Sequence, residues 1–371
     1  MKKALIHDWY YINGGAEKVI ASFTDMYPDF NHFALVDFLN NEDRNKILKG
    51  ATVNTSFIQK LPTAKKNHRK FLQLFPLAIE QFDLREFDLV LSSSASIAKG
   101  VLTTQEQLHI CYCHSPMRYA WDLYHQYLID SKLNKGLKSV YAKYILSKMR
   151  QWDVSTANRV DYFVANSNYI SKRIKKLYNK ESTVIYPPVD IEGYKLQNSK
   201  DDYYLTASRL VPYKKIKLIV EAFNKLPNKK LIVVGDGPEF KNIQQIAKEN
   251  IELKGFVESE KLHGLMQDAR AFVFAAKEDF GIVPVEAQAC GTPVIALRQG
   301  GVKETVVENI TGVFFEKQSV QSIVDAIEKF ETMTFIPEEI RSHVLKFSTD
   351  RFKKEMQDFI EEKYDYFKNS M

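Results

Sequence analysis

One stretch of the chain, residues 271–297, constrains the fold more than any other. The apolar run at 271–276 predicts a buried strand, and the run at 293–297 predicts a second one. Between these runs, Pro284 suits the first turn of a short helix and Gly291 suits its end. A helix that joins two buried strands is typical of a parallel sheet covered by helices on both faces.

The loop before this short helix has the features of an anion site. Gly281 allows the backbone to approach a ligand closely, and the free N–H groups of Ile282 and Val283 would then face that ligand. Glu278 and Glu286 stand on either side of the helix start, eight positions apart. By themselves, two glutamates at this spacing also fit a plain strand, loop and helix with solvated carboxylates.

The same alternation of strands and helices continues through the chain. In the first half, we predict strands at residues 4–9, 32–37, 88–93, 108–113 and 162–165. In the second half, we predict strands at residues 203–207, 231–237, 251–257, 271–276 and 293–297. This order indicates an α/β protein with parallel sheets.

The domain boundary is predicted at residues 183–190, where a further strand runs into a rigid linker with two consecutive prolines. They end at Pro188, where they prevent a helix from continuing and favour an extended backbone. A charged, loop-like segment follows at residues 198–202. We therefore predict one domain over residues 1–188 and a second over residues 189–349.

Composition excludes several classes of protein. The 371 residues are 45% hydrophobic and 26% charged, which is typical of a soluble globular protein, and no apolar run is long enough to cross a bilayer. Residues 1–9 predict a first strand and not a signal peptide. The three cysteines, Cys111, Cys113 and Cys290, contain no Cys-x-x-Cys pair, which favours a reducing compartment and argues against disulfides or zinc.

Several candidate ligand-binding residues follow predicted strands, at the sheet edge where ligands bind in open α/β sheets. Gly14 and Gly15 follow the first strand, and His114 follows the strand at 108–113. Arg209 and Lys214 follow the first strand of the second half. Each feature also has a plain alternative, namely a tight turn, a structural histidine and a pair of solvated cations.

Taken whole, residues 277–294 resemble the signature of the retaining glycosyltransferases of family 4. That signature is Glu, seven residues and Glu, with Phe-Gly inside it and Glu-Ala-x-Ala-x-Gly-x-Pro-Val at its end. The resemblance implies the GT-B fold, with two Rossmann-like domains that face a central cleft. It also implies that the first domain binds the acceptor and the second binds the nucleotide sugar. The helix predicted at residues 350–371 would cross back onto the first domain, with an apolar stripe of Phe352, Met356, Phe359 and Ile360.

The resemblance also implies roles for individual residues. Arg209 and Lys214 would hold the donor phosphates, and Lys215 is an adjacent candidate. Glu278 would hold sugar hydroxyls, and His114 would contact the transferred sugar; with Arg209 and Lys214, these are the predicted catalytic residues. Glu286 would bind the ribose, and the remaining donor contacts would come from Gly14, Gly15, Phe256, Val257, Phe280, Gly281, Ile282 and Val283. Because the sequence contains no Asp-x-Asp, two fixed cations would replace a metal, and we expect no metal cofactor.

A longer string points to a donor class. Residues 114–121, His-Ser-Pro-Met-Arg-Tyr-Ala-Trp, resemble a subgroup that transfers mannose or related sugars from GDP donors in bacterial O-antigen and exopolysaccharide assembly. We therefore expect a GDP-sugar donor, with a UDP-sugar as the alternative, and a lipid-linked oligosaccharide or another glycan as acceptor. Two other classes remain open: a GT-B sugar phosphorylase, and a sugar-nucleotide binding protein without catalysis.

The net charge of +6 is concentrated in the first half. Residues 60–76 contain five Lys and Arg, and residues 131–150 contain six, with no Asp or Glu in either stretch. Both stretches also carry apolar side chains, so we predict contact with an anionic membrane surface, above all through Lys65, Lys66, Arg69 and Lys70. Solvated helix faces with buried aromatics are the alternative. Without a recognised nucleic-acid motif, no nucleic-acid partner is expected; we expect a cytoplasmic protein, peripheral at the inner face of the plasma membrane.

Overall fold

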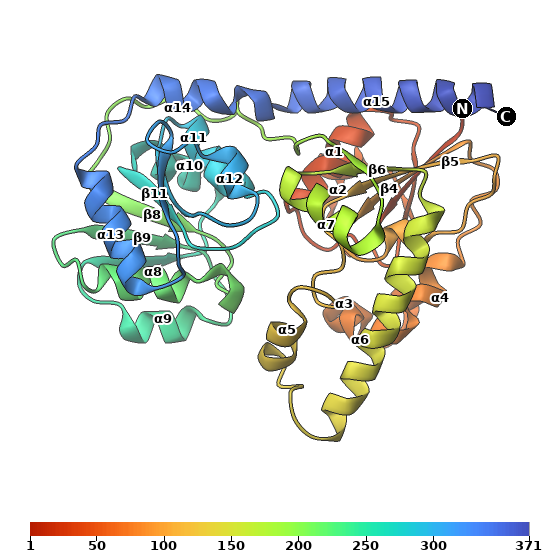
Figure 1. Ribbon diagram of the computed structural model, residues 1–371, viewed down its shortest axis with the longest axis horizontal. Coiled ribbons are helices and arrows are strands. Elements are labelled where there is room, and N and C mark those ends of the chain that lie inside the picture. Colours follow the sequence, from red (N-terminus) through yellow and green to blue (C-terminus); the bar gives the residue numbers. More distant parts are fainter. Residues whose placement is uncertain (371) are drawn as a thin grey trace. The chain divides into compact units, whose positions relative to one another are not determined.

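The computed structural model describes residues 1–370 and divides the chain into two compact units. Unit 1 contains Met1–Pro188 and the segment from Asp350 onward, and unit 2 contains Val189–Thr349. Each unit has one parallel β-sheet with helices packed against it (Figure 1). Among the described residues, none of the helices combines the length and the apolar character that crossing a bilayer requires.

The sheet of unit 1 has seven strands in the order β3-β2-β1-β4-β5-β6-β7, and all neighbours are parallel. The strands are β1 (Lys3–His7), β2 (Asn31–Ala34), β3 (Val53–Thr55), β4 (Leu89–Ser94), β5 (Leu108–Cys113), β6 (Tyr162–Ala165) and β7 (Ser182–Val184). The central strands β4 and β5 are buried along their whole length, including the three serines that end β4 and His109 of β5. Cys111 and Cys113 of β5 are buried and unoxidised.

Helices cover both faces of this sheet. The α-helices are α1 (Gly15–Met26), α2 (Asn41–Leu48), α3 (Ala64–Asn67), α4 (Phe75–Glu80), α5 (Tyr124–Asp130), α6 (Leu137–Thr156), α7 (Asn168–Tyr178) and α15 (Thr349–Ser370). Short 3-10 turns are η1 (Phe57–Lys60), η2 (His68–Leu74), η3 (Ala98–Gly100) and η4 (Ala157–Arg159). The first turns of α6 extend well beyond the sheet (Figure 1).

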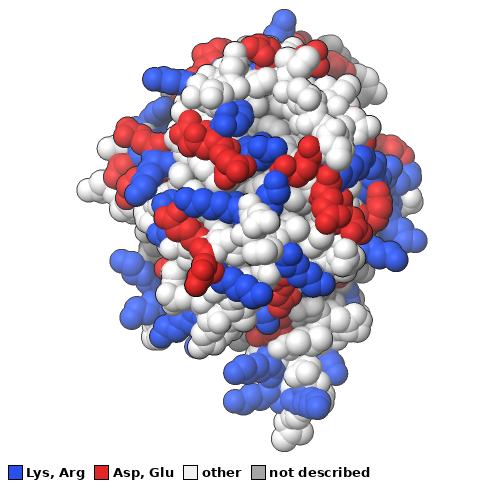
Figure 2. Space-filling view, turned by 90° about the vertical axis from the view of Figure 1, so that its left-hand side faces the viewer, with Lys and Arg blue, Asp and Glu red and all other residues white. Residues whose placement is uncertain are grey.

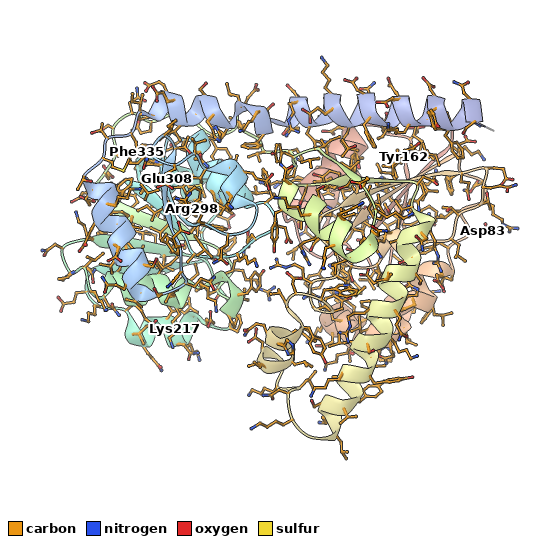
Figure 3. All side chains as sticks on the ribbon, viewed as in Figure 1. Asp83, Tyr162, Lys217, Arg298, Glu308 and Phe335 are labelled. Atoms are coloured by element: carbon orange, nitrogen blue, oxygen red, sulfur yellow. The ribbon has the colours of Figure 1, made fainter. Side chains whose placement is uncertain are left out.

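The last helix, α15, packs on unit 1 beside α1 (Figure 1). The predicted stripe of Phe352, Met356, Phe359 and Ile360 is buried, and the Phe352 ring lies 5.6 Å from that of Phe23 in α1. Further along, Tyr162 of β6 meets Phe359 edge-on at 6.3 Å (Figure 3). These contacts confirm that the end of the chain returns to the first unit.

The sheet of unit 2 has six parallel strands in the order β10-β9-β8-β11-β12-β13. The strands are β8 (Tyr203–Ala207), β9 (Lys230–Val234), β10 (Ile251–Gly255), β11 (Ala271–Phe274), β12 (Val294–Leu297) and β13 (Gly312–Phe315). The α-helices are α8 (Ile216–Phe223), α9 (Phe240–Ile246), α10 (Ser259–Asp268), α11 (Ile282–Ala289), α12 (Val302–Thr305), α13 (Val320–Glu331) and α14 (Pro337–Val344). The 3-10 turns are η5 (Pro212–Lys214) and η6 (Leu345–Phe347).

Ion pairs on the surface of unit 2 tie its last strand to neighbouring elements. Arg298, just after β12, pairs with Glu308, and its Nε lies 2.6 Å from a carboxylate oxygen of Glu316 after β13 (Figure 3). The second carboxylate oxygen of Glu308 lies 2.8 Å from Nζ of Lys329 in α13. Arg298 and Lys329 are therefore both paired with nearby carboxylates.

Both predicted sheets are present, and the α/β fold class is confirmed. Each predicted strand corresponds to an observed one, with ends that differ by a few residues. Two short edge strands, β3 and β13, were not predicted. Strand β3 has three residues, none fully buried, so it lacks an apolar pattern. In β13, Gly312 lies so close to β12 that a Cβ there would be 1.9 Å from the Val294 carbonyl oxygen.

Candidate active site

In unit 1, polar residues gather where the adjacent strands β1, β4 and β5 end. His7 closes β1 and Asp8 follows it, Ser93 lies near the end of β4, and His114 follows β5. The Asp8 carboxylate accepts hydrogen bonds from the backbone N–H groups of Ala95, at 2.7 Å, Ile97 and Ala98, which fixes the turn after β4. The carboxyl edge of the sheet is thus a rigid, polar surface.

His114 is held by three contacts on this edge. Its Nε2 lies 2.7 Å from Oγ of Ser93, its backbone N–H donates to Ser94, and its carbonyl accepts from the Asn166 side chain at 2.9 Å. Burial, with a smaller contribution from the charge of His7, lowers the pKa of His114 to about 3. The imidazole is therefore neutral at pH 7 and suited to hydrogen bonding, not to carrying charge.

The predicted glycine turn is organised by two residues that the sequence reasoning missed. The Glu17 carboxylate accepts from the N–H of Gly14 at 3.1 Å, at the start of α1, where Gly15 is the first helical residue. The other oxygen of Glu17 lies 3.6 Å from Nε2 of His7, and Nδ1 of His7 lies 3.2 Å from the Ser93 carbonyl oxygen. Burial lowers the pKa of His7, but Glu17, Asp8 and the Ser93 carbonyl together outweigh that effect and raise the pKa above its ordinary value.

In unit 2, the structure brings two predicted residues into direct contact. Lys214, at the end of η5, forms an ion pair with Glu278, although 64 positions separate them in sequence. Both side chains are mostly buried, with 16% and 18% of their surface exposed. A cation and a carboxylate are therefore fixed together above the ends of β8 and β11.

The loop that carries Glu278 is held by a second glycine turn. The backbone N–H of Gly301 donates to the Glu278 carbonyl at 2.9 Å, and Gly300 forms an isolated bridge with Glu278. A Cβ at Gly300 would lie 2.3 Å from the Glu278 carbonyl oxygen, so only glycine fits there. The turn at 300–301 thus sets the position of the glutamate.

Helix α11 begins as predicted, directly after Gly281. Gly281 has φ 91°, a left-handed conformation that favours glycine, and no side chain caps the helix. The first N–H groups, those of Ile282 and Val283, are therefore oriented as an anion site requires. The Phe280 side chain packs against Phe347 with ring centroids 5.4 Å apart, so the donor contact predicted for Phe280 could come only from its backbone.

Glu286 lies in the second turn of α11, and only 7% of its surface is exposed. It interacts with Tyr194, and burial together with this carboxylate raises the pKa of Tyr194 well above its ordinary range. The Tyr194 ring also packs on His263 at 4.3 Å. Tyr194 was not predicted as part of the site, because nothing in its local sequence links it to α11.

The remaining donor candidates differ in their surroundings. The exposed Arg209 has no ion-pair partner among residues 1–370. Lys215 directly precedes α8, and its φ of 59° forms the turn into that helix. Its neighbour Lys214 makes the contact with Glu278. Phe256 is 74% exposed and Val257 half-buried, after β10 at the edge of the sheet.

The basic quartet lies apart from these residues along the chain. Lys65 and Lys66 are exposed on α3, and Arg69 and Lys70 are exposed on η2. The Arg69 guanidinium stacks over the Trp9 ring at 5.3 Å, two positions beyond His7. Within the described part of the chain, no group of three or more His, Cys, Asp and Glu side chains could hold a metal ion.

The missed residues His7, Asp8 and Glu17 share a signal that sequence alone contains. His7 and Asp8 come directly after an apolar run, at the ligand-binding end of a strand, and Glu17 lies in the first turn of the helix that follows. Charged residues in that position are unusual for a plain βα connection, because all three become buried.

Two family models match the chain. The model for glycosyltransferase family 4 matches residues 13–192, and the model for group 1 glycosyl transferases matches residues 190–346. The chain is 30% identical over 202 residues to an uncharacterised glycosyltransferase of Methanocaldococcus jannaschii, a match over 52% of this chain and 56% of that protein. The chain thus spans about half the length of that relative.

Two mannosyltransferases are also similar. A GDP-mannose-dependent phosphatidylinositol monomannoside mannosyltransferase of Mycolicibacterium smegmatis is 34% identical over 137 residues, which are 32% of this chain and 36% of that protein. The mouse alpha-1,3/1,6-mannosyltransferase ALG2 is 27% identical over 300 residues, which are 70% of this chain and 68% of that protein.

Solved structures agree on the fold. HepE of Anabaena in complex with UDP superposes with a TM-score of 0.69 at 18% identity, over 98% of this chain and 100% of that one. Sucrose-phosphate synthase of Thermosynechococcus elongatus gives a TM-score of 0.70 at 13% identity, over 99% and 100%. Because both units match a glycosyltransferase model and the fold is GT-B, the chain belongs to the family 4 glycosyltransferases.

Proposed function

We propose that this protein is a retaining glycosyltransferase that moves a sugar from a nucleotide-sugar donor onto a glycan acceptor. The observation that carries the proposal is the pair of Lys214 and Glu278, fixed beside the uncapped start of α11. A diphosphate needs positive charge and N–H groups, and a hexose needs a carboxylate for its hydroxyls. These groups occur together in unit 2.

In this proposal, each residue has a separate role. Lys214, Arg209 and the N–H groups of Ile282 and Val283 stabilise the charge that develops on the leaving nucleoside diphosphate. Glu286 binds the ribose hydroxyls, and Phe256 and Val257 flank the base. From unit 1, the neutral His114 donates or accepts a hydrogen bond at the sugar, and Gly14 and Gly15 leave room for the phosphates. Retention of configuration is taken from the family.

For the donor, we propose a GDP-sugar, with mannose as the transferred group. The support is the string at residues 114–121 and the mannosyltransferase names of the mycobacterial and mouse relatives. A UDP-sugar is the alternative, since a structure with the same fold contains UDP. The two donors differ in the base, so the contacts near Phe256 would select between them.

A panel of nucleotide sugars tests the proposal directly. The purified protein is incubated with GDP- and UDP-sugars and an acceptor mixture, and release of nucleoside diphosphate is measured. We expect GDP-mannose to give the fastest release, and we expect release to persist in EDTA because fixed cations replace a metal. Release from no donor would refute the transferase and leave a binding protein, whereas release of a sugar phosphate that requires inorganic phosphate would indicate a phosphorylase.

We further propose that the acceptor is lipid-linked and that unit 1 contacts an anionic membrane surface. The support is the exposed quartet of Lys65, Lys66, Arg69 and Lys70. Each such cation near an anionic surface adds about 1 kcal/mol of attraction, which salt weakens. The protein should pellet with phosphatidylglycerol vesicles at low salt, and replacing the quartet by Gln should weaken pelleting. A protein that stays in the supernatant at low salt would point to a soluble acceptor.

A further inference from the structure

A groove runs along α6 where this helix packs against η2. Its volume is about 620 Å³, and its apolar lining includes Leu72, Leu133, Leu137, Tyr141, Ile145 and Leu146. A second hollow of about 550 Å³ shares Ile145 and Gln73 with the first and continues to Trp152 and Ser155. From Leu137 to Ser155, α6 rises by roughly 27 Å at 1.5 Å per residue. The groove and the second hollow together are therefore long enough to hold an extended apolar chain.

The basic residues of this groove have no counter-ions. Arg69, Lys70 and Lys138 line it, no acidic side chain does, and none of the three forms an ion pair among the described residues. A cluster of unpaired cations beside an apolar trough is complementary to a molecule with an anionic head and an apolar chain.

The start of α6 exposes an apolar stripe next to the groove. Leu137, Val140, Tyr141 and Tyr144 have helical spacing and are 90%, 66%, 59% and 58% exposed. Such a stripe is normally buried against a core. At the lower end of Figure 2, the height at which α6 begins in Figure 1, lysine and arginine surround uncharged residues and no acidic residue is visible.

The groove is connected to the polar edge of unit 1 through aromatic residues. Arg69 stacks over Trp9, which follows β1. Tyr127, which lines the groove, packs on Tyr119 at 5.9 Å, and the Tyr119 hydroxyl lies 2.7 Å from Oγ of Ser96 after β4. Arg69 and Tyr127 therefore connect the groove to the sheet edge that carries His114.

We propose that this groove binds one lipid phosphate, the anchor of the lipid-linked acceptor. The lipid chain lies in the trough along α6, and Arg69, Lys70 and Lys138 hold the phosphate. The stripe at the start of α6 shields the part of the chain that leaves the groove. This inference rests on the proposed function, which it deepens by assigning the acceptor anchor to specific residues.

Isothermal titration with farnesyl diphosphate, below its micellar concentration, tests the groove without a membrane. GDP is present in excess so that the donor phosphate site is filled. We expect farnesyl diphosphate to bind at least about tenfold more tightly than inorganic diphosphate, because its chain buries apolar surface, and more tightly than farnesol, which lacks the charge. Equal binding of farnesyl diphosphate and inorganic diphosphate would overturn the proposal.

Matched variants locate the binding. Leu137→Ser with Tyr141→Ser, and separately Lys70→Gln with Lys138→Gln, should each weaken farnesyl diphosphate at least about tenfold, whereas Tyr366→Ser on α15 and Lys172→Gln with Lys176→Gln on α7 should not. The groove residues changed in each pair are exposed, so the fold should persist; melting temperature and the shift caused by GDP check this.

Two outcomes separate this proposal from its rivals. If the groove variants bind farnesyl diphosphate as the unchanged protein does, the proposal is wrong even when donor turnover is normal. If farnesyl diphosphate binds and the variants lose it while no sugar donor is used, the groove assignment stands and the transferase proposal fails. Sedimentation velocity provides the last check, because self-association lost in Leu137→Ser, without lipid binding, would make the stripe an interface between copies of the chain.

Discussion

At the scale of single residues, the contact between Lys214 and Glu278 is the sharpest basis for a prediction. Glu278→Gln keeps the shape of the side chain but removes its charge, and Lys214→Ala removes the cation. Each change should lower turnover at least about a hundredfold, because a fixed charge that acts on the transition state is lost. Turnover with the preferred donor measures the effect, and Lys217→Ala on α8 is the control. Near-normal turnover in either variant would contradict the assigned role.

The same pair shows which parts of the site sequence can predict. Glu278, Gly281 and Glu286 belong to one continuous stretch whose spacing identifies them. The partner of Glu278 lies 64 positions away, and choosing Lys214 over Lys215 needed the turn at η5, where Lys215 adopts φ 59°. Long-range side-chain pairing depends on how strands are ordered in the sheet, and local pattern does not encode that order.

At the scale of an element, the turn at 300–301 should matter because it supports Glu278. In Gly300→Ala, the new Cβ would lie 2.3 Å from the Glu278 carbonyl oxygen, at a φ of +79° that disfavours alanine. We expect a loss of about 1–3 kcal/mol in unfolding free energy and at least about tenfold lower turnover.

The control for this turn is Gly264→Ala in α10, where a Cβ would meet nothing within 4 Å. That change should stabilise the protein by about 0.5–1 kcal/mol, because alanine favours the helix. Denaturant unfolding gives both free energies. A Gly300→Ala variant as stable and active as the unchanged protein would show that the loop is not held by this turn.

A buried ion pair anchors helix α6. Lys99 and Asp153 are 2% and 0% exposed, and Nζ lies 2.7 Å from Oδ1. The other carboxylate oxygen accepts from Trp121 at 2.7 Å and from Tyr178 at 2.9 Å. Asp153→Asn would leave Lys99 as an unpaired buried charge and should cost about 3–5 kcal/mol in unfolding free energy.

The double change Lys99→Met with Asp153→Asn removes both charges and should cost less than Asp153→Asn alone. Urea unfolding of the two variants measures the difference, and equal losses would mean that the ion pair is not the source of the effect. The sequence did not indicate this pair, because a lysine and an aspartate 54 positions apart give no periodic signal. It did predict the strands around the pair, because short apolar runs bounded by turn residues are typical of buried strands.

At the scale of the whole molecule, buried histidines make the stability depend on pH, and most of them lie in unit 1. Burial lowers the pKa of His32, His68 and His109 to about 4, and that of His114 to about 3; all four lie in unit 1, whereas unit 2 contains His343, whose pKa burial also lowers to about 4. In the unfolded chain they titrate near 6.5, so between pH 6.5 and about 4 the unfolded state binds more protons. Stability should therefore fall as the pH falls through this window, by up to about 1.4 kcal/mol per pH unit for each histidine.

His7 acts in the opposite direction, because its raised pKa gives stability that is present below pH 6.5 and is lost as the pH rises. The stability that His7 adds at low pH offsets only part of the stability that the four histidines of unit 1 with lowered pKa remove. All three tryptophans, Trp9, Trp121 and Trp152, lie in unit 1, so intrinsic fluorescence reports its unfolding. Urea unfolding followed in this way should show lower stability at pH 5 than at pH 7, and His109→Gln should reduce the difference, because it removes one titrating group. A fluorescence-detected stability that stays constant between pH 7 and pH 5 would mean that these histidines bind as many protons in the folded protein as in the unfolded chain, which would contradict their lowered pKa values.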